Sequence, residues 1–127
     1  MDLGIEGKVA MITGGSRGLG RQAALCLARE GCKVSICARS QEQLDTTVAE
    51  FASLGYQAHG TPADVTSEDD AARFYQETID HLGQPDILVN NVGGRKGTIL
   101  EETSLDLFKE GLELNLYSAY RMIGLVL

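Results

Sequence analysis

A glycine-rich turn between an apolar run and an amphipathic helix places the strongest constraint on the fold of this chain. Residues 8–12 (Lys-Val-Ala-Met-Ile) are mostly apolar and predict a strand buried on both faces. From Gly18 to Glu30, apolar residues recur at helical spacing until Gly31 ends the pattern. The turn itself, residues 13–20, is Thr-Gly-Gly-Ser-Arg-Gly-Leu-Gly. Free backbone N–H groups and the positive dipole end at such a helix start attract phosphate.

Three glycines in this turn have separate predicted roles. Gly14 permits a tight turn, Gly18 lets a ligand approach the backbone, and Gly20 lets the helix pack closely on the strand. The alternative is a glycine-rich turn without a ligand. We favour a nucleotide site because a strand precedes the turn and a helix follows it, as such a fingerprint requires.

Strands and helices alternate along the rest of the chain. Further apolar runs predict strands at residues 34–38, 56–63 and 86–89. Two helices begin at the capping-box patterns Ser40-x-x-Gln43 and Ser67-x-x-Asp70. A last helix has an apolar face made of Leu105, Phe108, Leu112, Leu116, Tyr120 and Ile123. This order predicts an α/β fold of the Rossmann type, a doubly wound parallel sheet with helices on both faces.

Four strands are fewer than the six or more of a complete doubly wound nucleotide-binding fold. Residues 124–127 (Gly-Leu-Val-Leu) are apolar and lie inside the last expected helix, with no cap or polar tail after them. We therefore expect residues 1–127 to form a single dinucleotide-binding domain that is incomplete, truncated after the fourth strand and the fifth helix.

Composition excludes several other classes of protein. The net charge of −7 argues against a nucleic-acid-binding protein, which usually has a basic face. No apolar run is long enough to cross a membrane, and the first residues lack a signal-peptide pattern. Cys26, Cys32 and Cys37 form no C-x-x-C pair, which favours reduced, buried thiols in a cytoplasmic protein. His59 and His81 have no partners at ligand spacing, so we expect no metal site.

Four sequence motifs follow one another along the chain. The glycine turn has the spacing T-G-x-x-x-G-x-G, Asp64-Val65 follows the third expected strand, Asn90-Asn91-Val92-Gly93 follows the fourth, and Asn115 lies in the last helix. Together they resemble the classical short-chain dehydrogenase/reductase family, over the whole chain and in its cofactor-binding half. The family has an adenine-contacting pair at the second motif, N-N-A-G at the third, with Val92 here replacing alanine, and a catalytic asparagine at the fourth.

The resemblance implies which residues hold the cofactor. They are Gly14, Ser16, Arg17, Gly18, Leu19, Gly20, Arg39, Asp64, Val65, Asn90, Asn91 and Gly93. In the family, the carboxylate matching Asp64 accepts a hydrogen bond from the adenine amino group, and the amide matching Val65 bonds a ring nitrogen. One asparagine braces neighbouring strands, and the adjoining backbone meets the ribose. The alternatives are local, with Asp64 capping a turn and the asparagines bonding their own backbone.

Asn115 is the catalytic candidate within these residues. By helical spacing it lies near the apolar face of the last helix, so we expect it to face inward. An unpaired buried amide is unfavourable by about 1–3 kcal/mol. One hypothesis is therefore a structural hydrogen bond across the core. The resemblance implies the other, in which the asparagine holds a water that connects a catalytic lysine to solvent as a proton relay.

The residues after the second expected strand indicate the cofactor. NAD-preferring Rossmann enzymes have an acidic residue there, which binds the ribose hydroxyls. This chain has Ala38 followed by Arg39, and Arg17 lies in the glycine turn. A carboxylate would repel a 2′-phosphate, whereas arginines can bind it. We expect NADP (NADPH) as cofactor; the alternative leaves both arginines as solvated surface residues.

The proton donor for hydride transfer is missing from these residues. In the family it is a tyrosine four residues before a lysine, assisted by a serine, and no tyrosine here has a lysine at that spacing. We interpret Tyr117 and Arg121 as a helix-surface pair. We expect the full-length protein to interconvert an alcohol and a ketone on a small molecule and to form a homo-oligomer, a dimer or tetramer. Residues 1–127 alone are expected to be inactive.

Three alternatives to this function remain. The first is a non-catalytic nucleotide-binding Rossmann fragment or interaction module. The second is an extended short-chain enzyme such as a sugar epimerase, whose turn resembles T-G-x-x-G-x-x-G and thus differs in spacing. The third is a methyltransferase, which normally has an acidic residue at the end of the second strand, where this chain has Ala38-Arg39.

Overall fold

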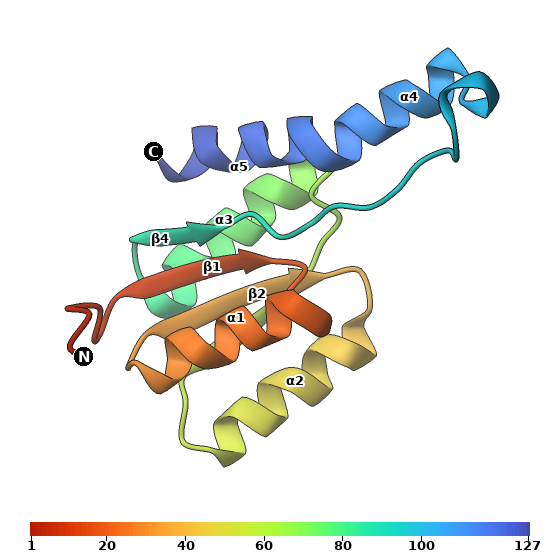
Figure 1. Ribbon diagram of the computed structural model, residues 1–127. Coiled ribbons are helices and arrows are strands. Elements are labelled where there is room, and N and C mark those ends of the chain that lie inside the picture. The colour runs from red at the N-terminus through yellow and green to blue at the C-terminus, as the bar shows by residue number, and fades with distance from the viewer.

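The computed structural model describes all of residues 1–127 and contains a parallel sheet in the order β3-β2-β1-β4 (Figure 1). Its strands are β1 (Val9–Thr13), β2 (Lys33–Ala38), β3 (Ala58–Pro62) and β4 (Ile87–Val89). The connecting helices are α1 (Gly18–Arg29), α2 (Gln41–Ser53) and α3 (Glu68–Leu82). The chain then forms η1 (Leu100–Glu102), α4 (Leu105–Leu112), η2 (Glu113–Tyr117) and α5 (Ser118–Val126). This arrangement confirms the predicted Rossmann-type α/β fold.

Two apolar layers cover the two faces of the sheet. Ala10 and Ile12 of β1 face α1 and α2, whereas Met11 between them faces α3 and α5, as the alternation of a strand requires. Figure 1 shows α1 and α2 on one side of the sheet and α3 with α5 on the other. Phe51 of α2 and Phe74 of α3 are fully buried, one in each layer. Burial of each phenylalanine contributes about 1.5–3 kcal/mol to stability.

Serine caps begin the helices that follow β2 and β3. Ser40 Oγ accepts a hydrogen bond from the Gln43 N–H at 3.3 Å, and Ser67 Oγ accepts one from the Asp70 N–H at 3.3 Å. The predicted capping boxes are half formed, because the side chains of Gln43 and Asp70 bond the loops after β1 and β3 instead. Each of these helix starts is thereby tied to a loop at the carboxyl edge of the sheet.

The single helix expected at the end of the sequence is interrupted by the π turn η2. Such a turn inserts an extra residue and changes the phase of the residues that follow. The face that packs on the sheet layer consequently holds Ser118 and Met122. The predicted apolar face is instead largely exposed, with exposed fractions between 43% and 78% for Leu105, Phe108, Leu116, Tyr120 and Ile123. The prediction of one unbroken helix was wrong because the π turn separates α4 from α5.

Burial of the three cysteines differs from the expectation at one position. Cys32 and Cys37 are buried, but Cys26 lies on the exposed side of α1, so the prediction of buried thiols was wrong for Cys26.

None of the helices combines the length and the apolar content needed to cross a bilayer.

Candidate functional site

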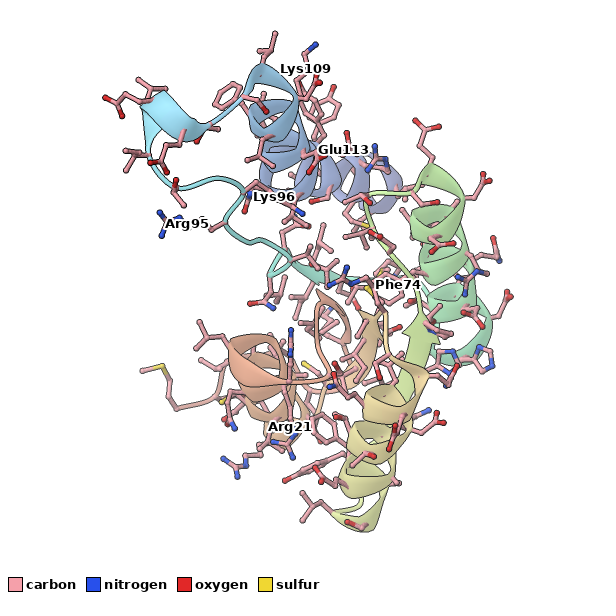
Figure 2. The ribbon with its side chains drawn as sticks, turned by 90° about the vertical axis from the view of Figure 1, so that its right-hand side faces the viewer. Arg21, Phe74, Arg95, Lys96, Lys109 and Glu113 are labelled. Atoms are coloured by element: carbon pink, nitrogen blue, oxygen red, sulfur yellow. The ribbon has the colours of Figure 1, made fainter.

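A groove of about 880 Å³ runs along the carboxyl edge of the sheet, where all four parallel strands end. The loops after the strands line it, and Glu110, Glu113 and Leu114 from the C-terminal helices close one side. Figure 2 shows Glu113 on the C-terminal helical segment, in η2, and Arg95 and Lys96 on the loop after β4. The volume is typical of small-molecule sites, at roughly 300–1,000 Å³. Open α/β sheets bind ligands at this edge, where the strand order reverses.

Helix α1 begins at the glycine turn without a side-chain cap. The side chain of Arg17, the N-cap residue, makes no capping hydrogen bond, whereas serines cap α2, α3 and α4. The first N–H groups of α1 are therefore available to an anion. A Cβ atom added to Gly18, at φ +56°, would meet no atom within 4 Å, so the space in front of the helix is open. This opening fits the phosphates of a dinucleotide.

Ser16 in the glycine turn is held by α2. Its hydroxyl donates to Gln43 Oε1 at 3.4 Å, and Thr47 Oγ1 donates to the Ser16 carbonyl at 3.0 Å. These bonds fix the turn before any ligand binds, which lowers the ordering cost of binding. Leu19, one turn further on, is exposed and does not line the groove.

Asn91 ties the end of β4 to the glycine turn. Its side-chain nitrogen donates to the Gly14 carbonyl at 3.1 Å. Thr13 Oγ1 accepts hydrogen bonds from the backbone N–H groups of Asn91 and Val92 at 3.0 and 3.1 Å. Asn91 is therefore the bracing asparagine, while Asn90 is exposed and lies outside the groove. Sequence reasoning missed Thr13, although it precedes Gly14 in the motif.

One carboxylate oxygen of Asp64 caps the turn that follows β3, as the local alternative predicted. Its Oδ1 accepts hydrogen bonds from the Thr66 N–H at 3.0 Å and the Thr66 hydroxyl at 2.7 Å. Its Oδ2 has no protein partner, and the residue lines the groove. The Asp64 N–H donates to Asp70 Oδ2 at 2.9 Å; this bond, with help from Arg73, lowers the pKa of the Asp70 carboxyl. The local role and a ligand-binding role are thus compatible.

Arg121 of α5 holds the neighbouring residue, Val65. Its Nη1 donates to the Val65 carbonyl at 2.8 Å, and its Nη2 pairs with Glu113 Oε1 at 2.9 Å. The predicted surface pair of Tyr117 and Arg121 was wrong, because the π turn directs the arginine toward the β3–α3 loop. Helix α5 and the groove are connected through this side chain.

Asn115 lies in the π turn and clamps the loop after β4. Its Oδ1 accepts from the Gly94 N–H at 2.9 Å, and its Nδ2 donates to the carbonyls of Gly94 at 2.8 Å and Gly111 at 2.9 Å. The side chain is exposed, so the expectation that it faces the core was wrong. A structural hydrogen-bond role is present, although it fastens a loop rather than crossing the core. The proton relay stays a prediction.

Three arginines of the groove have no acidic partner. They are Arg17, Arg39 and Arg95. Lys96, in contrast, lies 3.9 Å from Glu110. Cys37 also lines the groove, and burial raises the pKa of its thiol to about 12, so the thiol stays protonated at neutral pH. Because these three arginines are charged and have no acidic partner, the groove offers positive charge to an anionic ligand.

The groove brings together nine of the residues proposed from sequence: Gly14, Ser16, Arg17, Gly18, Arg39, Asp64, Val65, Asn91 and Gly93. Gly20 does not line the groove; it lets α1 approach the glycine turn, because a Cβ atom there would overlap the Gly14 carbonyl. Sequence reasoning missed the residues of the β4 loop and the C-terminal helices: Gly94, Arg95, Lys96, Glu110, Glu113 and Leu114. The loop residues directly follow the Asn90–Gly93 motif, but no local pattern indicates which helix turn faces them.

The doubly wound sheet, the open helix start and the groove at the carboxyl edge define a nucleotide-binding α/β protein. The sequence model of the family described as short chain dehydrogenase matches residues 8–127. The chain belongs to this family, which confirms the resemblance found in its motifs.

Individual relatives include a peroxisomal 2,4-dienoyl-CoA reductase of Arabidopsis thaliana, 34% identical over 118 residues that cover 93% of this chain and 40% of that protein. A solved 7α-hydroxysteroid dehydrogenase complexed with NADH is 33% identical, with a TM-score of 0.91, covering 96% of this chain and 48% of that chain. A variant actinorhodin polyketide ketoreductase with NADPH is 32% identical, with a TM-score of 0.89, covering 99% of this chain and 48% of that chain. The chain spans about half the length of these relatives or slightly less.

Proposed function

We propose that the protein is an NADP(H)-dependent oxidoreductase that interconverts an alcohol and a ketone on a small molecule, and that this chain holds its cofactor. Its similarity to a polyketide ketoreductase and a hydroxysteroid dehydrogenase supports the alcohol–ketone chemistry. One of these solved structures contains NADPH and the other NADH, so the choice of cofactor rests on this chain's own residues.

The observation that carries the preference for NADP(H) is the presence of two unpaired arginines, Arg17 and Arg39, in the same groove as Ala38. Arg17, which follows β1, and Arg39, which follows β2, both line the groove, and neither has an acidic partner. Their guanidinium groups can bind a 2′-phosphate, and Ala38 brings no carboxylate that would repel it.

The remaining groove residues fit the other parts of the cofactor. The open N–H groups at Gly18 would bind the pyrophosphate, and Asp64 Oδ2 with the backbone of Val65 would bind the adenine. The backbone at Asn91 and Gly93 would meet a ribose. Bound NADPH supplies the hydride, while these residues hold it at the carboxyl edge of the sheet.

We further propose that residues 1–127 alone show no turnover, because they lack a tyrosine–lysine pair that could protonate the developing alkoxide. Asn115 would contribute the proton relay in the full-length enzyme. NADPH oxidation with a panel of ketones, measured on purified residues 1–127, tests this. Turnover above background that disappears in Tyr117→Phe would show that the wrong tyrosine was dismissed. NADPH binding without turnover by the full-length protein would favour a non-catalytic nucleotide-binding module.

Arg39→Ala in the full-length protein tests the cofactor preference. Because a charge-assisted hydrogen bond contributes about 1.5–3 kcal/mol, NADPH affinity should fall roughly 10–100-fold, with little change for NADH. Adding Ala38→Asp should shift the preference toward NADH. Fluorescence titration of both cofactors measures the dissociation constants.

Arg29→Ala is the matched control. Arg29 also has no acidic partner, but it lies at the opposite end of α1 and outside the groove, so its removal should leave both affinities unchanged. Equal losses for NADPH and NADH in Arg39→Ala would mean that Arg39 does not recognise the 2′-phosphate.

A further inference from the structure

Unpaired positive charge is concentrated in the groove. Of the eleven lysines and arginines, five form ion pairs: Lys8, Arg21, Arg73, Lys96 and Arg121. Three of the other six line the groove: Arg17, Arg39 and Arg95. In a chain with a net charge of −7, this distribution favours anionic ligands at this one place.

Arg95 lies at the other end of the groove from Arg39. Arg39 follows β2 and Arg95 follows β4, and β1 separates these two strands. Neighbouring strands are about 4.8 Å apart, so the ends of β2 and β4 are separated by roughly 10 Å. The 2′-phosphate assigned to Arg39 therefore leaves Arg95 available for a second anion.

The guanidinium of Arg95 is oriented by its own loop. Its Nε donates to the Gly97 carbonyl at 3.0 Å, and its Nη2 donates to the Thr98 carbonyl at 2.9 Å. Gly97 has φ +85°, which lets the loop fold back around the side chain. A guanidinium has five N–H donors, and those on Nη1 have no protein acceptor here. An oriented group with free donors favours a carboxylate or phosphate.

The other charged groups at this end of the groove neutralise one another. Lys96 Nζ lies 3.9 Å from Glu110 Oε2, and Glu113 pairs with Arg121 at 2.9 Å. Figure 2 shows Arg95 and Lys96 on the loop after β4 and Glu113 on the helix. Among the charged residues that line this end of the groove, only Arg95 has no ion-pair partner, which matches a single anionic group.

We propose that Arg95 binds an anionic group of the carbonyl substrate, so that the preferred substrates are oxo compounds that carry a carboxylate or a phosphate. This inference rests on the proposed function. A dinucleotide whose 2′-phosphate lies at Arg39 extends across the strand-order reversal toward β4, which puts its reactive end on the side of Arg95. The anion on the substrate then fixes the orientation of the carbonyl at that end.

Three probes with the same oxo group separate the sources of the anion. Acetoacetate carries a carboxylate, acetoacetyl-CoA carries phosphates, and methyl acetoacetate is neutral. Their binding to the full-length protein with saturating NADPH is measured by the change in NADPH fluorescence, and kcat/KM is measured for each. The variants are Arg95→Gln and, as a control, Lys109→Gln. Lys109 has no acidic partner and lies on α4 outside the groove (Figure 2).

We expect Arg95→Gln to weaken binding of acetoacetate about 10–100-fold while methyl acetoacetate changes less than about twofold, with Lys109→Gln matching the unmodified protein. A loss confined to acetoacetyl-CoA assigns the site to a phosphate. Equal binding of both anionic probes by the Arg95→Gln and unmodified proteins, or no binding of either probe, overturns the proposal. If NADPH itself fails to bind, the proposed function fails and this inference fails with it; if NADPH binds normally, only this inference is at risk.

Discussion

Single side chains at the carboxyl edge of the sheet serve packing and the groove at once. Thr13 Oγ1 accepts two backbone N–H groups of the β4 loop, and Asn91 bonds the Gly14 carbonyl. Gln43, at the start of α2, contacts the Ser16 hydroxyl. Substitutions here will change stability together with ligand affinity, so a binding defect needs a stability measurement beside it.

Gly20 is the glycine with the least space for a side chain, and this yields a stability prediction. A Cβ atom added there would overlap the Gly14 carbonyl and lie 2.5 Å from Asn91 Nδ2. Because the obstacle is backbone, Gly20→Ala should lower the free energy of unfolding by about 1–3 kcal/mol. Urea denaturation measures it.

Gly124→Ala is the control for this prediction. Gly124 lies in helix α5, and a Cβ atom there meets nothing within 4 Å. Alanine in an open helical position should leave stability unchanged or raise it by about 0.5–1 kcal/mol. A Gly20→Ala protein as stable as the unmodified one would show that the turn relaxes freely around the added methyl group.

At the scale of elements, the π turn η2 positions the amide that fastens the loop after β4. Asn115→Ala removes three hydrogen bonds, to Gly94 twice and to Gly111 once. We expect faster hydrogen exchange at the Gly94 amide and a loss of stability of about 1 kcal/mol, since the site is exposed. Asn90→Ala, which removes an exposed asparagine whose side chain has no partner, should change neither quantity. Unaltered exchange at Gly94 would contradict the clamp.

The packing of α3 on β3 brings together two histidines that have no partners at metal-ligand spacing in the sequence. His59 of β3 stacks on His81 of α3 with ring centroids 3.9 Å apart, and His81 Nδ1 hydrogen-bonds the Glu77 carbonyl at 2.9 Å. Burial, and next the neighbouring His81, lower the pKa of His59 from its ordinary value of 6.5, while Glu77 opposes the shift. Sequence spacing does not reveal this stack, because β3 and α3 meet only in the folded chain.

This lowered pKa predicts a loss of stability in acid. Between the folded and the ordinary pKa, the unfolded chain binds more protons, so stability rises with pH. The contribution of His59 is complete above pH 6.5 and is lost as the pH falls through the folded pKa. Urea unfolding at a series of pH values should show this slope reduced in His59→Gln. His81→Gln should reduce it less, because burial is the larger cause. An unchanged slope in His59→Gln would contradict the assignment.

At the scale of the whole molecule, the exposed apolar face of the C-terminal helices predicts association. Leu105, Phe108, Leu116, Tyr120 and Ile123 are all exposed on α4, η2 and α5. Burial of apolar surface contributes about 25 cal/mol per Å², so an uncovered face of this kind favours self-association. We therefore propose that the full-length protein is a homo-oligomer, a dimer or tetramer.

Light scattering at micromolar concentration tests the oligomer. Phe108→Glu together with Leu116→Glu should lower the molar mass, since two charges would be buried in the contact. Leu54→Glu is the control, because Leu54 is as exposed but lies at the end of α2, away from this face. A clean monomer for the unmodified protein would argue against association through these helices.

The amino-acid sequence by itself determined the alternation of strands and helices, the glycine turn and the family. These are local properties: Gly14 and Gly18 have positive φ, β1 is a continuous apolar run, and serines begin α2 and α3. Strand direction then follows, because helical connections of this length favour parallel strands. Nine of the proposed site residues lie in the groove for the same reason, since each lies in the loop, or at the first helical residue, after a strand that ends at that edge.

Only the tertiary structure decided the contacts between distant segments. Arg121 reaches Val65 across 56 positions of sequence, and Asn115 holds Gly94 across 21. The π turn shifted the helical phase, so spacing alone assigned Asn115 to the core, whereas it is exposed and bonds the loop after β4. The periodicity of apolar residues predicts which face of a helix or strand is apolar, but it does not predict how far that element lies from the others. Packing of α5 on the sheet layer through Met122 sets that distance, and with it which side chains meet at the groove.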